Sequence, residues 1–106
     1  MSILPTFDYY AVIFSSTKST NLEGYEEMDK ETMLLAQQQT GFLGYESVNF
    51  NNKGIFISYW QSKNDIDMWR KNATHLMAKA QAKHWYKRYL SQICLVQSSH
   101  EFNSEN

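Results

Sequence analysis

Two apolar segments separated by Asn-Asn-Lys-Gly impose the strongest constraint on how this chain can fold. Residues 42–50 (FLGYESVNF) and 55–60 (IFISYW) are rich in β-branched and aromatic side chains, and residues 51–54 lie between them. Asn and Gly tolerate the positive φ angles that tight hairpin turns require. The pattern therefore predicts a β-hairpin in the middle of the chain.

The segment before the hairpin predicts a strand followed by a helix. Residues 9–15 (YYAVIFS) form an apolar run of the length of a buried strand. Helical spacing of apolar residues then begins at Leu22, and Asn21 can act as the N-cap. We expect this helix to end at the glutamines 37–39 and Gly41.

The segment after the hairpin predicts a second helical region and a last strand. Ser62 or Asn64 can cap a helix that runs to about Lys71, and a second helical piece follows at about residues 73–85. Residues 89–97 (YLSQICLVQ) read as the fourth strand, with a continuation to Phe102 left open. The order β-α-β-β-α-β predicts an α+β, ferredoxin-like fold: an antiparallel sheet with both helices on one face.

Both faces of this predicted sheet are apolar. Tyr10, Val12 and Phe14 alternate with Ala11 and Ile13 along the first strand. Two helices on one side leave the other apolar face in water, which is unfavourable. We therefore expect a homodimer in which the sheets of two copies pack against each other.

Size and charge narrow the class of protein. The 106 residues fit one domain, with a core at about 9–102 and a polar tail at 103–106. The net charge of −1 and the interspersed charges argue against nucleic acid as a partner. One cysteine excludes an internal disulfide, and no apolar run approaches a membrane span. We expect a soluble, cytoplasmic protein with no membrane partner.

The segment from Tyr59 to His75 holds the candidate site. Trp69, Asn72 and His75 follow one another at three-residue spacing on one ridge of the predicted helix. A neutral His can accept a phenol proton, an Asn amide can orient a carbonyl, and an indole can wall a pocket. Each residue also has a structural interpretation: His75 as a helix histidine that is hydrogen-bonded to a neighbour and bridges helix to sheet, Asn72 as a surface cap, and Trp69 as part of the core packing.

Three further aromatic residues are candidates for the pocket. Tyr59 and Trp60 point to opposite faces of their strand, so only one of them can face the helices, and the sequence leaves open which. Phe14, on the first strand, is the third candidate.

The chain resembles the antibiotic biosynthesis monooxygenase (ABM) family of dimeric α+β barrel proteins, in particular a bacterial subgroup of mostly uncharacterised members. The resemblance covers about residues 9–102 and is clearest in 41–47 (GFLGYES) and 57–60 (ISYW). It continues through the positions Ile66, Trp69, Asn72, His75, Trp85, Tyr86, Tyr89, Glu101 and Phe102.

The resemblance implies a dimer held partly by the C-terminal strand, and a pocket between sheet and helices in each protomer. It also implies a cofactor-free monooxygenase of a small aromatic or quinone-like substrate, with His75 as base, Asn72 as orienting amide and Trp69 as pocket wall. On this reading we expect no cofactor and no metal. The alternative from a different class is a non-catalytic dimeric module that binds a small ligand or serves in stress physiology.

Haem degradation, known among relatives of the ABM family, is less well supported by these residues. Haem-degrading members combine an Asn on the first strand, a Trp on the second helix and a His further along it. Trp69 fits, but the position of the His is occupied by Lys79, and the first strand ends in Phe14-Ser15-Ser16. A metal site needs convergent ligands, and His75, His84 and His100 lack carboxylates at suitable spacing.

Overall fold

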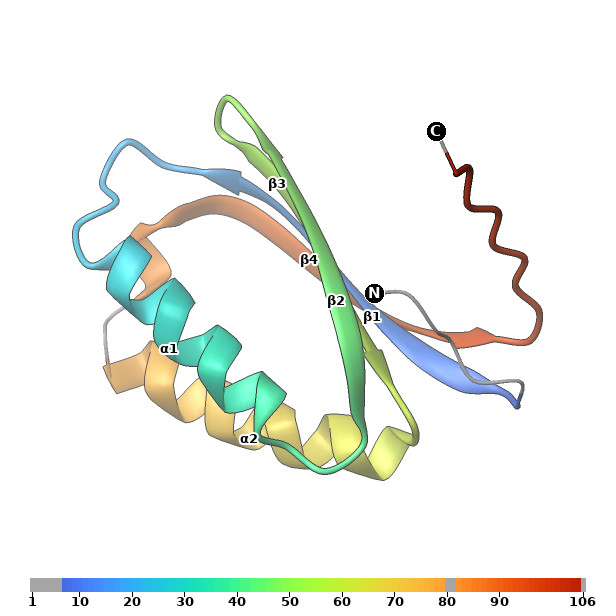
Figure 1. The fold of residues 1–106 in the computed structure, drawn as a ribbon. Helices are drawn as coiled ribbons and strands as arrows, with labels where there is room; N and C mark the ends of the chain where they lie inside the picture. The colour runs from blue at the N-terminus through green and yellow to red at the C-terminus, as the bar shows by residue number, and fades with distance from the viewer. Residues whose placement is uncertain (1–6, 80–81, 106) are drawn as a thin grey trace.

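The computed structural model describes residues 7–79 and 82–105, which form a single antiparallel sheet with two helices on one side (Figure 1). The strands are β1 (Tyr9–Lys18), β2 (Phe42–Phe50), β3 (Lys53–Trp60) and β4 (Tyr86–Val96), in the spatial order β2-β3-β1-β4. The helices are α1 (Tyr25–Gln37) and α2 (Lys63–Lys79), and the short 3-10 helix η1 (Ala82–His84) precedes β4. The predicted ferredoxin-like α+β fold is confirmed.

The central hairpin has the predicted strands and turn. β2 and β3 pair from Phe42 opposite Trp60 to Phe50 opposite Lys53. Asn51 in the turn has φ 56°, the positive value that the Asn-rich linker suggested. β3 begins at Lys53, earlier than expected, because Gly54 still pairs with Asn49 across the hairpin.

The start of α1 differs from the prediction. Asn21 is not the N-cap and Leu22 is not helical; the helix begins at Tyr25, after Gly24 in the left-handed conformation at φ 81°. A left-handed residue interrupts helical hydrogen bonding, so the chain before it cannot join the helix. Asn21 instead closes a turn in which its backbone N–H donates to Ser19 Oγ at 3.1 Å.

Helix α2 is unbroken, where two helical pieces were predicted with a break between Lys71 and Ala73. Residues 63–79 contain neither Gly nor Pro, so no residue in the segment favours a break. Ile66, Trp69 and Ala73 are buried at helical spacing and bind the whole middle of the helix to the sheet.

The last strand also has different bounds from those predicted. β4 begins at Tyr86 rather than Tyr89, because β1 continues to Lys18 and pairs with Tyr86 there. It ends at Val96 and does not continue to Phe102. Residues 97–105 run away from the sheet as an extended tail, with Phe102 exposed (Figure 1).

The junction between β3 and α2 is fixed by a capping pair. Ser62 Oγ accepts the backbone N–H of Asp65 at 3.2 Å and donates to Asp65 Oδ2 at 2.8 Å, as expected for one of the two predicted caps. Gly41, at φ 82°, lies directly against the Asp65 side chain, and its carbonyl accepts the Gln61 backbone N–H at 2.8 Å. The entry to β2 and the start of α2 are therefore held together.

The core lies between the helices and one face of the sheet. Strand alternation and register place Tyr10, Val12, Phe14, Ser16 and Lys18 of β1 on this helix-covered face. The buried cluster joins strands and helices through Val12, Ala36, Trp60, Ile66, Trp69 and Ala73, with Tyr10 and Phe42 packed against it.

The opposite face of the sheet carries no helix and remains apolar. Val48 and Phe50 of β2 are 68% and 76% exposed. Ile55 of β3 is exposed beside Val48, and Leu90 of β4 is exposed on the far side of Ser15. We call these four residues the open face.

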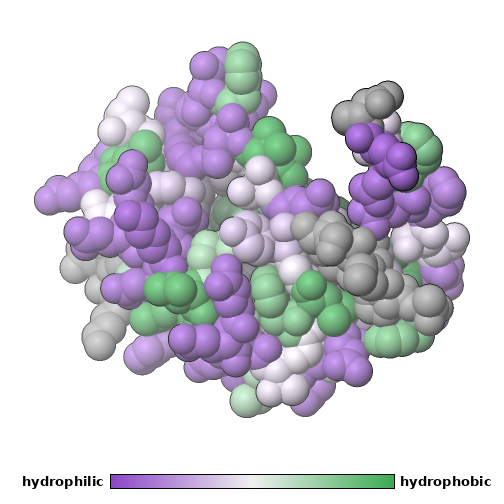
Figure 2. Space-filling model, viewed as in Figure 1, coloured by the Kyte–Doolittle hydropathy of each residue, from purple (hydrophilic) through white to green (hydrophobic). Residues whose placement is uncertain are grey.

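The side of the molecule seen in Figure 2 shows apolar residues in separate patches between hydrophilic ones.

Within the described ranges, neither helix has the length and apolar character needed to cross a membrane.

Replacing Gly41 by Ala tests the α2 junction. A Cβ at Gly41 would overlap the Asp65 carboxylate, and the positive φ adds the strain of a left-handed residue, about 1–2 kcal/mol. Gly24→Ala is the matched control: its φ is also positive, but its Cβ would meet Trp85 at an ordinary 3.7 Å. We expect Gly41→Ala to lower the free energy of unfolding in urea more than Gly24→Ala. Equal losses would contradict the close packing of Asp65 on Gly41.

Candidate functional site

Two indole rings form the centre of the candidate site. Trp60 at the end of β3 and Trp69 in α2 lie with ring centroids 5.2 Å apart and planes tilted by 30°. Phe42 of β2 meets Trp60 edge-on at 5.3 Å. We call these three rings the aromatic layer: Trp60 is 0% exposed, Trp69 is buried and Phe42 is partly buried on the helix-covered face of the sheet.

The two indole N–H groups have different surroundings. Trp60 Nε1 donates to Ser58 Oγ at 2.8 Å, and Ser58 is fully buried beside it. Trp69 Nε1 is also buried, yet it has no hydrogen-bond acceptor in the part of the chain that the structure describes. A buried donor without an acceptor costs about 1–3 kcal/mol. The Trp69 N–H is therefore an unused donor that an oxygen atom of a ligand could satisfy.

The structure shows which of the paired aromatic residues on β3 faces the helices. Trp60 does, whereas Tyr59 lies on the opposite face and packs edge-on against Tyr9 at 6.0 Å. The Tyr59 hydroxyl donates to Glu46 Oε2 at 2.9 Å. Burial and the neighbouring Glu46 carboxylate raise the pKa of Tyr59 to about 12, so it stays a neutral donor. Tyr59 is thus separated by the sheet from the aromatic layer.

Asn72 and His75 are exposed, although Trp69 on the same ridge of α2 is buried. Three residues turn an α-helix by about 300°, so each step of three falls back by about 60°. Two such steps carry His75 from the sheet-facing stripe of Ile66, Trp69 and Ala73 toward the solvent-facing flank. The three predicted site residues share one helix, but only Trp69 lies in the buried layer.

A second group of polar and aromatic side chains lies at the other end of β1. Phe14, the third pocket candidate, is half-buried and contacts Tyr86 and Tyr89 with centroids 5.6 and 5.4 Å away. Lys18 is 9% exposed, and its Nζ donates to Asn49 Oδ1 at 3.0 Å. Sequence reasoning missed Lys18, since it ended the strand at Ser15. The continued alternation to Ser16 and Lys18 was the available signal.

Ionisation in this second group is shaped by burial. Burial raises the pKa of Tyr86, and the nearby Tyr25 raises it further. Burial also raises the pKa of Asp29 on α1, an effect that the Lys18 ammonium partly opposes. Burial therefore favours the neutral phenol of Tyr86 in this group.

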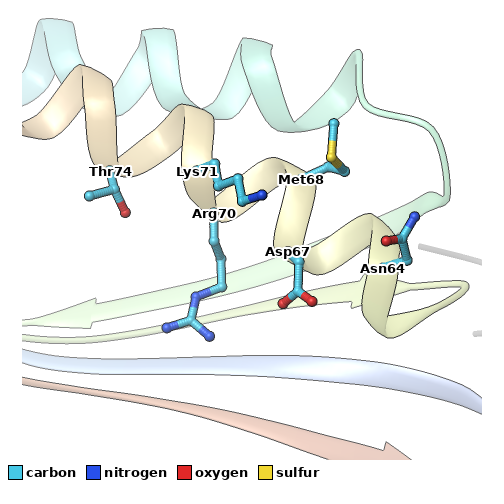
Figure 3. A pocket seen from close by; sticks show the side chains of 6 residues that line it. All are labelled: Asn64, Asp67, Met68, Arg70, Lys71 and Thr74. Carbon is cyan, nitrogen blue, oxygen red and sulfur yellow. The ribbon is translucent and has the colours of Figure 1, made fainter.

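A hollow of about 590 Å³ lies along the exposed side of α2, lined by Asn64, Asp67, Met68, Arg70, Lys71 and Thr74 (Figure 3). In Figure 3, Asp67 and Arg70 extend from the helix in one direction and Met68 in the other. The lining comes from one helix and its side chains are exposed, so they converge on no common point. Across residues 7–79 and 82–105, no three His, Cys, Asp or Glu side chains gather as metal ligands would.

Solved structures of other proteins share the fold of this chain. Cofactor-independent oxygenase SnoaB from Streptomyces nogalater superposes with a TM-score of 0.66 at 13% identity, over 92% of this chain and 99% of that one. Protein SO0527 from Shewanella oneidensis gives a TM-score of 0.70 at 10% identity, over 84% and 91% of the two chains. At these identities the likeness concerns the fold, and it agrees with the predicted ABM-type architecture.

Comparison of sequences identifies the family, which the comparison of folds does not. Protein YqjZ of Bacillus subtilis (strain 168), an uncharacterised protein, is 43% identical over 98 residues, which cover 91% of this chain and 86% of that protein. The family model described as Monooxygenase af470-like matches residues 12–102. These residues include most of β1, the central hairpin, both helices and β4, and thus the Phe42, Trp60 and Trp69 rings of the aromatic layer. The chain therefore belongs to the Monooxygenase af470-like family.

Proposed function

We propose that this protein is a cofactor-free monooxygenase of a small aromatic or quinone-like substrate. The observation that carries the proposal is the buried N–H of Trp69, whose ring packs against Trp60 and which lacks an acceptor among the described residues. A flat substrate ring matches the Trp60 and Trp69 indoles, and a phenol or carbonyl oxygen can accept the free N–H. Membership of a monooxygenase family and the fold shared with cofactor-independent SnoaB support this reaction class.

In the proposed reaction the substrate itself supplies the electrons. Deprotonation of a phenol or of an activated CH₂ group gives an electron-rich anion, which passes one electron to O₂. The two radicals combine at a ring C–H carbon of the phenol or at the CH₂ carbon to give a hydroperoxide, and loss of water converts that carbon to a carbonyl that keeps one oxygen atom. The protein contributes a dry aromatic site and the Trp69 N–H, which stabilises negative charge on the substrate oxygen.

In this proposal His75 and Asn72 have the roles of base and orienting amide, on the part of α2 outside the buried layer. Both are exposed on α2, so they act on a substrate that extends from the aromatic layer toward solvent. Proton transfer at these exposed positions has direct access to water, which is suitable for a base that must be regenerated after each turnover.

Replacing Trp69 by Phe tests the hydrogen bond to the ligand. We expect oxygen uptake with a panel of naphthols, measured in the presence of chelator. For the best of these compounds we expect Trp69→Phe to weaken affinity by about two- to tenfold, the size of one hydrogen bond. In the protein without ligand, Trp60→Phe should be more destabilising by about 1 kcal/mol, because its N–H is satisfied by Ser58.

The two outcomes of this comparison are separable. Equal ligand affinity of Trp69→Phe and the unmodified protein would show that the Trp69 indole does not hydrogen-bond the ligand. Binding without oxygen uptake by any compound would remove the oxygenase and favour the non-catalytic ligand-binding module. Urea unfolding of both variants controls for the similar loss of ring volume.

Replacing His75 by Ala tests the proposed base. We expect slower oxygen uptake with unchanged stability, because the exposed imidazole contributes little to packing. His84→Ala is the matched control, since His84 is also exposed and accepts Ser19 Oγ only through its backbone carbonyl. Unchanged turnover in His75→Ala would exclude this residue as the base.

We also propose that a second copy of the chain covers the open face, giving a homodimer. The support is the exposed apolar row of Val48, Phe50, Ile55 and Leu90, which is unfavourable in water.

Replacing Ile55 by Glu tests the dimer. A carboxylate buried between two open faces would lack a partner, so we expect sedimentation velocity to show a monomer in place of a dimer. Leu34→Glu on α1 is the control, because Leu34 is comparably exposed on the helical side of the molecule. A dimer that persists in Ile55→Glu would place the interface elsewhere.

A further inference from the structure

Lys18 is a buried cation whose hydrogen-bonding capacity is only partly used. Its ammonium has three N–H donors. One donates to Asn49 Oδ1 at 3.0 Å, and the ammonium lies 5.3 Å from the centroid of the Tyr25 ring. Within residues 7–79 and 82–105, it forms no direct ion pair, and Asp29 acts on it only at longer range. Burying a charge is costly unless it is paired, so this position favours an anion as an additional partner.

The missing side chain of Gly54 allows polar groups to come close together around Lys18. A Cβ on Gly54 would lie 2.6 Å from Asn49 Oδ1, 3.1 Å from Lys18 Nζ and 3.5 Å from Ser16 Oγ. These three polar groups, from β2 and β1, therefore gather over the one residue of β3 that has no side chain. Any larger residue at position 54 would push the ammonium away from Asn49.

Aromatic rings border this polar group along the same face of the sheet. Tyr25 and Tyr86 meet edge-on at 6.3 Å, and Tyr86 contacts Tyr89 at 5.8 Å. Phe14 lies parallel to Tyr89, with planes 22° apart. Tyr89 is 61% exposed, so solvent reaches the group from the β4 side. A cation bordered by flat rings matches a ligand that combines a ring with an anionic oxygen.

We infer that Lys18, with Asn49, Ser16 and the rings of Phe14, Tyr86 and Tyr89, forms a second binding site, which takes the anionic oxygen of a small aromatic ligand. The Lys18 ammonium pairs with a phenolate or carboxylate oxygen, and the rings contact the aromatic part of the ligand. This site is independent of the proposed oxygenase, because β1 separates Lys18 from Tyr10, the residue that pairs with Trp60, by eight positions.

The charged and titratable groups around the site come from three elements. Lys18 lies at the end of β1, Tyr25 and Asp29 lie on α1, and Tyr86 and Tyr89 lie on β4. Asp29 is the acid that acts electrostatically on Lys18, so it competes with an anionic ligand. Its removal should therefore strengthen anion binding, which gives the inference a test of opposite sign to the loss of Lys18.

The probe is para-nitrophenol, which is yellow only as the phenolate. At a fixed pH where both forms are present in solution, binding next to the ammonium should increase phenolate absorbance in a saturable way. We expect Lys18→Met to weaken phenolate binding about tenfold or more, the size of a hydrogen bond to a charged group. We expect Asp29→Asn to strengthen it, and Lys30→Met, an exposed change on α1, to leave it unaltered.

Further measurements separate the possible outcomes. Benzoate should displace the phenolate and benzyl alcohol should not, if the anionic oxygen is what the site recognises. If Lys18→Met does not fold, Asp29→Asn decides, and unchanged affinity in that variant overturns the inference. Probe binding that is retained in Lys18→Met but lost in Trp69→Phe would also overturn the inference, because the probe would then occupy the aromatic layer. If the protein binds the phenolate but takes up no oxygen with the panel described above, this site stands and only the proposed oxygenase is contradicted.

Discussion

The contact between Trp60 and Trp69 joins the sheet to α2, and most of the remaining structure depends on it. Trp60 is fully buried and lies between Phe42 on the neighbouring strand and Trp69 on the helix. Large aromatic rings bury more apolar surface than any other side chain, so this contact contributes a large share of the packing of a small domain. It also fixes the rotation of α2 about its axis, and with it the positions of Asn72 and His75.

Polar groups inside this fold are concentrated at two places on one face of the sheet. Near the indoles, Ser58 accepts the Trp60 N–H, whereas the Trp69 N–H has no acceptor among the residues that the structure describes. At the far end of β1, Lys18 and Ser16 replace the apolar residues that precede them in the alternation. The helices cover both places, and burial makes each unsatisfied group energetically significant. The same covering that stabilises the domain therefore creates its candidate binding groups.

The sequence predicted the strands better than the helix ends. β2 has the predicted bounds, and Asn51 has the turn conformation that the Asn-rich linker suggested. Asn21 looked like a cap, but Gly24 adopted a left-handed conformation and moved the start of α1 to Tyr25. A local preference for capping cannot reveal where the chain must turn to bring α1 onto the sheet.

By itself the sequence determined the element order, the apolar character of both sheet faces and the membership of a monooxygenase family, because these depend on residue type and spacing along the chain. Only the tertiary structure decided that Trp60 rather than Tyr59 faces the helices, since strand alternation separates the two residues without orienting them. It also decided that Trp69 is buried while His75 is exposed, and that Lys18 is enclosed. Those results depend on which side of each element meets its neighbours, and that is settled when sheet and helices pack together.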